Sequence, residues 1–215
     1  MNSLDPTVQR LVEHSDLEQR LSEIPVGAEV RGLYFKNVQK VLGRLGVTGD
    51  YHALYPETYS AIRWYPVRDY LERLAVAGAL LRGSENLHEG VREIARSNAT
   101  TFTESLLGRA MLLILARDPV RLLKQAMGGR RLSHNYGIWD LSFPEPGKAI
   151  IEMKDEYLWM DSYLFGAAEG TFASTEPRVT ITCELDSMYQ GRHVFSWDPQ
   201  ERERTRGDKS PSVAL

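Results

Sequence analysis

The sequence predicts an α+β fold: an N-terminal helical bundle followed by a β-β-α-β-β segment, whose four-stranded antiparallel sheet packs on helices. Apolar residues recur at helical spacing through the first two-thirds of the chain. After Gly129 the apolar period changes to two, in two pairs of segments separated by one more helical segment. We expect a single domain over residues 1–198 and a disordered, charged tail over residues 199–215.

Two helices in the first part carry clear apolar stripes. One stripe stops at Gly46 and contains Leu33, Phe35, Val38, Val41, Leu42 and Leu45. Pro66 begins the other helix, which ends at Gly83 and carries Val67, Tyr70, Leu71, Leu74, Gly78 and Leu81. Residues 55–66, between them, are aromatic with prolines at both ends. They predict an irregular, partly buried link.

Three further helices are expected before the sheet. Residues 84–97 form a polar one. Thr101 and Glu104 form a capping box for the next, which is apolar almost all round to Ala116 and therefore predicted to be buried. Asp118 and Pro119 then begin a short helix that is expected to end at Gly128 and Gly129.

Alternating apolar and polar residues predict the four strands of the sheet. Apolar side chains occupy every second position in Trp139–Phe143, Ala149–Met153, Val179–Leu185 and His193–Trp197, so each strand has one wet face. Residues 158–172 predict the intervening helix.

The chain's one cysteine, Cys183, lies in the last hairpin with His193. A turn centred in SMYQG predicts pairs whose numbers sum to 378, which sets Leu185 opposite His193 and Cys183 opposite Phe195. Cys183 and His193 are then diagonal neighbours, about 7 Å apart at Cα. We interpret Cys183 as a core residue and His193 as a rim residue bonded to backbone or water. A hydrolase that uses this pair is the alternative, although no third residue orients the base.

A polar strip on the apolar helix is the first candidate binding feature. Arg109 offers a forked donor for a carboxylate or phosphate, and Glu104 lies near it on the same helix. The alternatives are a solvent-facing edge and a buried ion pair that fixes packing.

Aromatic residues supply the second feature. As pocket walls we select Trp64, Tyr65, Trp159 and Tyr163. Core packing is the alternative for the cluster Tyr51, Tyr55, Tyr59, Trp64, Tyr65 and Tyr70. Arg63 lies inside this cluster, where it is placed to stack on a ring. His88 falls on a charged, solvated helix face, which does not suit a haem ligand.

Composition excludes several classes of protein. The net charge of −3 and the scattered basic residues argue against nucleic acid and anionic membrane as partners. One cysteine forms no intramolecular disulfide, and the polar N-terminus lacks a signal peptide, so we expect a cytoplasmic protein. Neither a phosphate-binding glycine loop nor a metal-binding histidine pair such as HExxH occurs, and no cofactor or metal is expected.

Several phrases occur in an order that resembles a known family: RGLYF, WYPVRDYLERLA, TFTESLLGRAMLLIL with DPVRLL, and YLFGAAEG with GRHVFSW. They are similar to an uncharacterised paralogous family expanded in myxobacteria, over about residues 26–198. The element order also resembles the superfamily that unites haem-nitric-oxide-binding and vinyl-reductase-type domains. That resemblance implies a sensory domain enclosing a small apolar ligand, often as a dimer. The haem branch carries a YxSxR motif, whereas Tyr59 to Arg63 has another spacing, so haem is not carried over.

We therefore expect a non-catalytic ligand-binding or signalling domain with a mostly apolar pocket between the sheet and the central helices. A protein-interaction module, forming a homodimer or binding a regulatory protein, is the second hypothesis.

Overall fold

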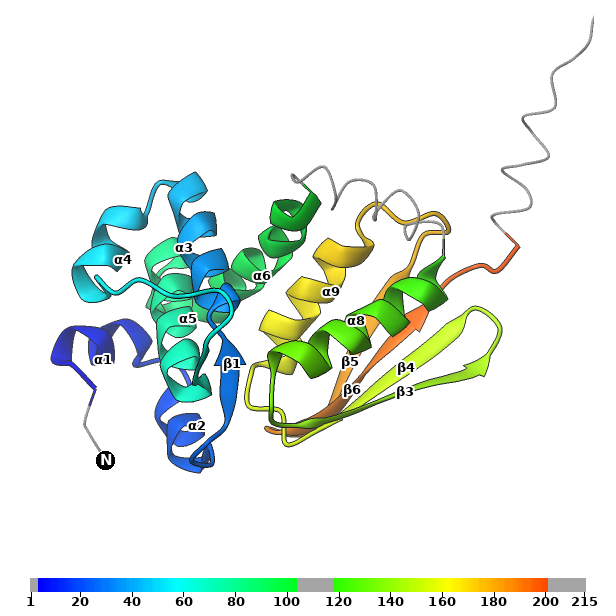
Figure 1. The fold of residues 1–215 in the computed structure, drawn as a ribbon, viewed down its shortest axis with the longest axis horizontal. Helices are drawn as coiled ribbons and strands as arrows, with labels where there is room; N and C mark the ends of the chain where they lie inside the picture. Colours follow the sequence, from blue (N-terminus) through cyan, green and yellow to red (C-terminus); the bar gives the residue numbers. More distant parts are fainter. Residues whose placement is uncertain (1–3, 104–117, 201–215) are drawn as a thin grey trace, which may run out of the picture.

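The computed structural model describes residues 4–103 and 118–200, and the side chains of residues 4–98 and 118–200. Figure 1 shows a helical half, residues 4–103, beside a sheet half, residues 118–200. The predicted α+β class is confirmed, with helices first and a four-stranded antiparallel sheet after them. None of the described helices is long and apolar enough to cross a bilayer.

The elements follow the predicted order. The helical half contains α1 (Pro6–Val12), α2 (Leu17–Glu23), β1 (Glu29–Arg31), α3 (Leu33–Leu45), α4 (Thr48–Leu54), β2 (Trp64–Pro66), α5 (Val67–Arg82), η1 (Ser84–Asn86) and α6 (Leu87–Thr103). The sheet half contains α8 (Pro119–Ser133), β3 (Ile138–Glu145), β4 (Lys148–Lys154), η2 (Met160–Leu164), α9 (Phe165–Phe172), β5 (Thr180–Ser187) and β6 (Gln190–Ser196).

Helices α3 and α5 confirm the central parts of the two predicted stripes, but Leu33 and Leu45 at the ends of the α3 stripe are exposed. The two helices end at the expected glycines, Gly46 with φ 78° and Gly83 with φ 85°, conformations that suit glycine. Helix α3 buries Phe35, Val38, Val41 and Leu42. Burying one such side chain contributes about 1.5–3 kcal/mol relative to exposing it, so these faces hold the helical half together.

Two helix boundaries differ from the prediction. Helix α6 is continuous from Leu87 through Thr103, so no new helix begins at Thr101; neither glycine nor proline interrupts residues 91–103. The Asp118 side chain caps α8 as predicted, accepting from Arg121 N at 3.0 Å. However, α8 passes through both glycines to Ser133, because Met127 and Arg130 on its last turns are buried against the sheet half.

The link over residues 55–66 is irregular only as far as Arg63. Trp64–Pro66 forms β2, which pairs antiparallel with β1, and Val30 also bridges to His134. Three-residue strands carry too little alternation for the sequence to predict them.

The large sheet has the order β3-β4-β6-β5. Helices α8 and α9 lie over one of its faces (Figure 1). On that face Ala149, Ile151, Met153 and Phe195 are buried, and Phe172 of α9 packs on Phe195 with ring centroids 5.3 Å apart. The predicted pattern of one buried and one wet face is confirmed, except at Phe143 and Leu185 on the edge strands β3 and β5, which are exposed.

The register predicted for the last hairpin is wrong by two residues. The pairs sum to 376: Cys183 lies directly opposite His193, and Ile181 opposite Phe195. The hairpin closes across Met188 and Tyr189 in a tighter turn than predicted, with a register shift between Leu185 and Ser187. A shift of two keeps each side chain on its predicted face, which is why the alternation alone could not detect it.

Polar side chains join the two halves. Arg20 is 5% exposed; its Nε donates to Asp16 at 2.8 Å, and its Nη1 donates to the carbonyls of Tyr157 and Met188, both at 3.3 Å. The Asn135 side chain accepts from Glu29 N at 2.7 Å and donates to Gly27 O at 2.9 Å. These bonds tie α2 and β1 to the sheet half.

Candidate functional site

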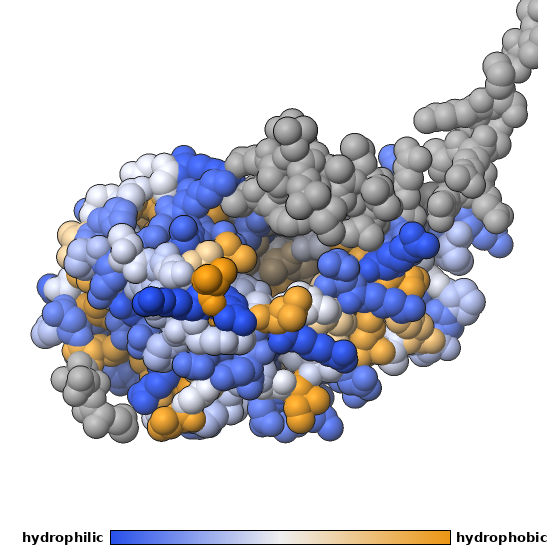
Figure 2. Space-filling model, viewed as in Figure 1, coloured by the Kyte–Doolittle hydropathy of each residue, from blue (hydrophilic) through white to orange (hydrophobic). Residues whose placement is uncertain are grey.

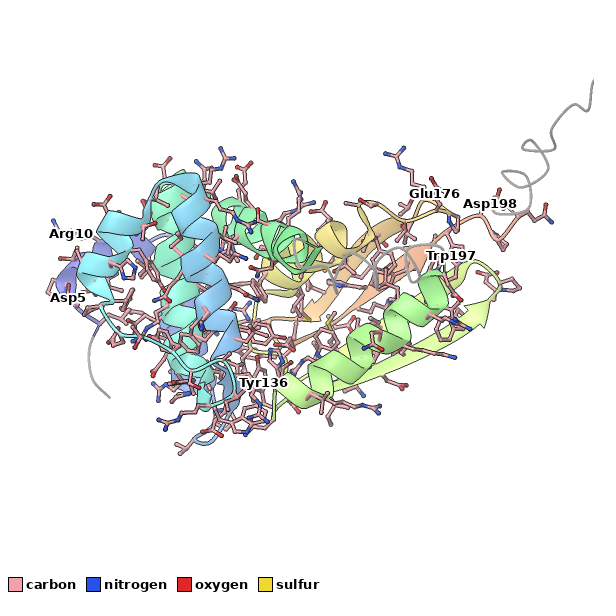
Figure 3. The ribbon with its side chains drawn as sticks, turned by 45° about the horizontal axis from the view of Figure 1, so that its top comes forward. Asp5, Arg10, Tyr136, Glu176, Trp197 and Asp198 are labelled. Atoms are coloured by element: carbon pink, nitrogen blue, oxygen red, sulfur yellow. The ribbon has the colours of Figure 1, made fainter. Side chains whose placement is uncertain are left out.

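Aromatic side chains from both halves meet between them, in what we call the tyrosine junction: Tyr34, Tyr70, Tyr136, Tyr163 and His134. The ring centroids of Tyr34 and Tyr70 are 5.8 Å apart, and those of Tyr70 and Tyr163 are 5.9 Å apart. His134 lies between Tyr34, at 4.7 Å, and Tyr136, at 5.6 Å. Figure 3 labels Tyr136 where the helical half meets α8 and the sheet.

Each half positions its tyrosines through ordinary local structure. Tyr70 belongs to the buried stripe of α5, and Tyr34 stands on the first turn of α3. Tyr163 lies in η2, a π-helical segment, and Tyr136 lies between α8 and Gly137, which has φ 69°. Short π-helical segments are frequent at functional sites, so η2 marks this region for attention.

Hydrogen bonds satisfy only part of the junction. The Tyr70 hydroxyl donates to the Tyr163 hydroxyl at 2.7 Å, and the Tyr34 hydroxyl lies 3.0 Å from Ser133 Oγ. Asn98 of α6 borders the junction, because its side chain acts on the Tyr163 hydroxyl. Within the described part of the chain, the buried hydroxyl of Tyr136 and the buried Oδ1 of Asn98 have no hydrogen-bond partner. Buried polar groups are normally paired, so these two require an explanation.

The junction hydroxyls are protonated at neutral pH. Burial raises the pKa of Tyr34, Tyr70, Tyr136 and Tyr163 above the ordinary value of tyrosine. The hydrogen bond that Tyr163 accepts from Tyr70 opposes this rise in the pKa of Tyr163, but the desolvation is larger. The four residues therefore offer O–H groups rather than phenolates.

A buried ion pair borders the junction. Glu156 is fully buried; it accepts from Arg130 Nη2 at 3.1 Å, Trp139 Nε1 at 2.8 Å and Leu158 N at 3.0 Å. Arg130 also donates to the Tyr136 carbonyl at 2.8 Å, and its guanidinium lies 4.7 Å from the Tyr136 ring centroid. The charge of Arg130 is therefore balanced by Glu156.

A second feature is an open cleft of about 780 Å³ on α6, here called the polar cleft: Arg82, His88, Glu89, Arg92, Glu93, Arg96, Ser97, Asp161 and Ser162. Its arginines are paired: Arg82 with Glu93 at 2.6 Å, and Arg92 and Arg96 with Glu169, both at 2.5 Å. His88 is half-buried rather than solvated as expected, because its ring contacts Trp159 and its Nδ1 lies 3.4 Å from Ser162 Oγ.

With this geometry established, comparison with known proteins gives the family. A family model for DUF2378, described as a protein of unknown function, matches residues 25–187. The chain belongs to the DUF2378 family. No curated protein matches it.

Solved structures place this DUF2378 chain in a known fold. An H-NOX protein from K. algicida, in its unliganded Fe(II) state, is 14% identical; the match covers 78% of this chain and 96% of that one, with a TM-score of 0.59. An H-NOX protein from S. oneidensis, in its Fe(II)NO state, is 8% identical over 78% of this chain and 99% of that one, with a TM-score of 0.52. At these identities the likeness shows the fold alone.

The described residues do not fit the haem of those relatives. His134 is packed edge-on against the rings of Tyr34 and Tyr136, and its Nδ1 lies 2.9 Å from Ser133 Oγ, which leaves no open apolar face beside it for a porphyrin. The Nε2 of His193 donates to the Met160 carbonyl at 2.9 Å. His88 faces the charged side chains of the polar cleft, whereas a haem ligand needs an apolar pocket.

The predicted wall residues lie in different places. Tyr163 is in the tyrosine junction. Tyr65 contacts Phe35 at 5.5 Å, and Phe35 contacts Tyr70 at 5.1 Å, so Tyr65 lies two ring contacts from the junction. Trp159 is buried and its Nε1 donates to Asp16 at 2.7 Å. The ring of Trp64 is half-buried under the Arg31 guanidinium, 3.8 Å away. Glu104 and Arg109 lie outside the described residues.

Two other expectations change. In the aromatic cluster Tyr51, Tyr55 and Tyr70 are buried, as core packing predicts. The cations over its rings are Arg73, 4.6 Å from the Tyr55 ring, and Arg31 over Trp64, whereas Arg63 is exposed. His193 is not a rim residue: it is 3% exposed, because β6 is an inner strand covered by η2. Its bond to backbone is confirmed.

Cys183 lies on the helix-covered face as predicted, but only half-buried, since β5 is an edge strand. Burial raises the pKa of its thiol to about 11, which is the wrong direction for a nucleophile. Burial also lowers the pKa of His193, and its Nε2 proton is bound to a carbonyl. Among the described residues nothing in this pair supports the hydrolase alternative.

Sequence reasoning missed most of the junction. Tyr34 is one helical turn before Val38 and on the same face, so the α3 stripe contained a signal for it. Tyr136 and His134 follow α8 in a segment without periodicity, and only the structure shows them beside Tyr34. No three His, Cys, Asp or Glu side chains in the described ranges gather as metal ligands.

Proposed function

We propose that this DUF2378 chain is a non-catalytic sensory domain that binds a small, mostly apolar molecule at the tyrosine junction. The observation that carries the proposal is the pair of buried, unpartnered polar atoms there, Tyr136 Oη and Asn98 Oδ1. A bound molecule that supplies their missing hydrogen bonds would explain both.

The energetics support this interpretation. Leaving a buried polar group unpaired costs about 1–3 kcal/mol, so the closed junction is under-stabilised at these atoms. Both atoms are out of reach of water in this structure, and a ligand must therefore open the junction slightly to reach them. Figure 2 shows a recess between the helical half and the sheet half with apolar atoms on its floor, and we propose this recess as the approach route.

The remaining predicted residues enter the proposal as follows. Tyr163 forms a wall of the junction, and Tyr65 supports it through Phe35 and Tyr70. Trp159 and Trp64 are placed as outer walls. Arg109 and Glu104 remain predicted contacts for the polar end of the ligand. One H-NOX structure of this fold is described in an Fe(II)NO ligation state, which supports a ligand-binding role for this chain, with another ligand.

Native mass spectrometry tests the proposal. The purified protein is sprayed in its folded and in its denatured state, and we expect a mass excess that disappears on denaturation. The Tyr136→Phe variant should retain less of it. Tyr51→Phe is the matched control, because Tyr51 also has a buried hydroxyl without a partner among the described residues, but in the packing of α4.

Both variants remove an unpaired hydroxyl and should be stabilised to a similar degree, by about 1 kcal/mol. Only Tyr136→Phe should lose ligand. Equal retention by the two variants, or a wild-type protein that carries no ligand and binds no added one, would overturn the proposal.

One observation favours the second candidate function, contact with another protein. Large apolar side chains are exposed near β1 and β2: Val26 is 99%, Ile62 80%, Leu132 75% and Ile138 63% exposed. Arg31 joins this region by donating to the carbonyls of Ile62 and Leu132. If the patch joins two copies of the chain, sedimentation velocity should show a dimer, and the Leu132→Glu variant should be a monomer. A wild-type protein that is a monomer would rule out self-association through this patch.

A further inference from the structure

We propose that the molecule bound at the tyrosine junction is uncharged and that a hydroxyl or carbonyl oxygen at its polar end accepts a hydrogen bond from Tyr136. This inference rests on the proposed function and adds the chemical class of the ligand.

The charges that border the junction cancel. Arg130 and Glu156 are the charged groups that act most strongly on the hydroxyls of Tyr34 and Tyr136, and they form an ion pair at 3.1 Å. Glu156 holds two further donors, Trp139 Nε1 and Leu158 N. The pair thus gives the junction almost no net charge with which to attract an ion. Arg130 Nε, which is buried without a hydrogen-bond partner in the described ranges, belongs to this neutralised pair.

Among the described residues, Arg20 is a further buried cation of the interface between the halves, and it is committed elsewhere. Arg20, beside Trp159, pairs with Asp16 at 2.8 Å and donates to two carbonyls. Its guanidinium also lies 5.5 Å from the ring centroids of both Trp159 and Tyr189. Moving Arg20 toward a ligand would break the bonds that join α2 to the sheet half.

The hydroxyl groups of the junction favour a ligand that carries a hydrogen-bond acceptor. Tyr136 is protonated and unpartnered within the described ranges, so it offers a donor to a ligand oxygen. A hydrocarbon leaves this donor unpaired. A carboxylate would pair with it but would bring into a desolvated site a negative charge that no unpaired cation among the described residues compensates, which is far more costly. A neutral oxygen satisfies the hydroxyl without that penalty.

Three probes of one shape test the inference: naphthyl methyl ketone, ethylnaphthalene and naphthoate, all substituted at the same ring carbon. Their dissociation constants are measured by fluorescence titration of the purified full chain, with the thermal midpoint of unfolding as a second readout. We expect the ketone to bind about tenfold more tightly than the hydrocarbon, the value of one hydrogen bond. The naphthoate should bind at least about a hundredfold more weakly than the ketone.

Two variants locate the effect. Tyr136→Phe should reduce the ratio of ketone to hydrocarbon affinity to about one, since only the hydrogen bond is removed. Tyr51→Phe should leave the ratio as in the wild type.

The outcomes separate the two proposals. If naphthoate binds as tightly as the ketone or more so, the ligand class is wrong while the binding function stands. If Tyr136→Phe keeps the wild-type ratio, Tyr136 is not the donor and the inference fails. If no probe binds and the native protein carries no ligand, the binding function itself fails.

Discussion

The tyrosine junction and the polar cleft both use side chains of η2, yet their polar atoms are satisfied in opposite ways. In the cleft the three arginines form short ion pairs with Glu93 and Glu169, and the site is open to water. In the junction Tyr136 and Asn98 each leave a buried polar atom without a partner inside the described ranges. The comparison teaches that hollow volume alone is a poor guide to function. Unmet hydrogen-bonding capacity is the stronger sign.

The largest expected effect is the loss of stability when an ion pair is broken, and this loss should differ between the two regions. Arg130→Met leaves Glu156, which is fully buried, without its counter-charge, and should lower the free energy of unfolding by about 3–5 kcal/mol. Arg82→Met breaks the pair with Glu93 in the cleft, where Arg82 is 48% exposed, and should cost about 0–1 kcal/mol. Urea denaturation measures both. Equal losses would show that the junction is no more desolvated than the cleft.

The next prediction concerns the wall between the regions, where α9 packs on α6. A Cβ on Gly166 would contact the backbone carbonyl of Arg92 far inside the normal distance, so Gly166→Ala should destabilise the protein by about 1–3 kcal/mol. In α8, a Cβ on Gly128 meets nothing within 4 Å, and Gly128→Ala should stabilise by about 0.5–1 kcal/mol. Thermal unfolding checks the opposite signs. A stable Gly166→Ala would mean that the α6–α9 contact is loose.

The same comparison shows what the sequence could predict. Strong periodicity gave α3, α5 and the four-stranded sheet, because each buries one face and the pattern records that face. It failed at Gly128 and Gly129, where the burial of Met127 and Arg130 outweighs local helix propensity. It also failed for the hairpin register, since a two-residue slip leaves every face unchanged.

The candidate site was harder to predict than the fold. Tyr163 was selected from its residue type, but Tyr34, Tyr70, Tyr136 and His134 come from α3, α5 and the segment after α8. Their meeting depends on how the two halves pack, which one sequence does not specify. The buried ion pair could not be predicted from the sequence either, because Glu156 and Arg130 are 26 residues apart and neither lies in a motif.

A smaller effect concerns His193, a buried histidine of the sheet half. Burial lowers the pKa of His193, so near pH 6 the unfolded chain takes up a proton that the folded chain resists. The stability that neutral, buried His193 contributes is complete above about pH 6.5, and it is lost as the pH falls toward the pKa of His193 in the folded state. We expect the urea midpoint to fall between about pH 7 and pH 5, and to fall less steeply in His193→Gln. An unchanged slope in His193→Gln would contradict the assignment.

The smallest expected effect is on the alkylation rate of Cys183, and it tests how far the water-excluding core extends toward the edge strand β5. Cys183 is directly opposite His193, and burial raises the pKa of its thiol to about 11. Since the thiolate is the reacting form, iodoacetamide at about pH 8 should modify the folded protein about a hundredfold more slowly than the urea-unfolded chain. Intact mass spectrometry follows the reaction. Equal rates would mean that the inner face of β5 opens readily, which would return a nucleophile to the hydrolase alternative and weaken the case for a desolvated junction behind it.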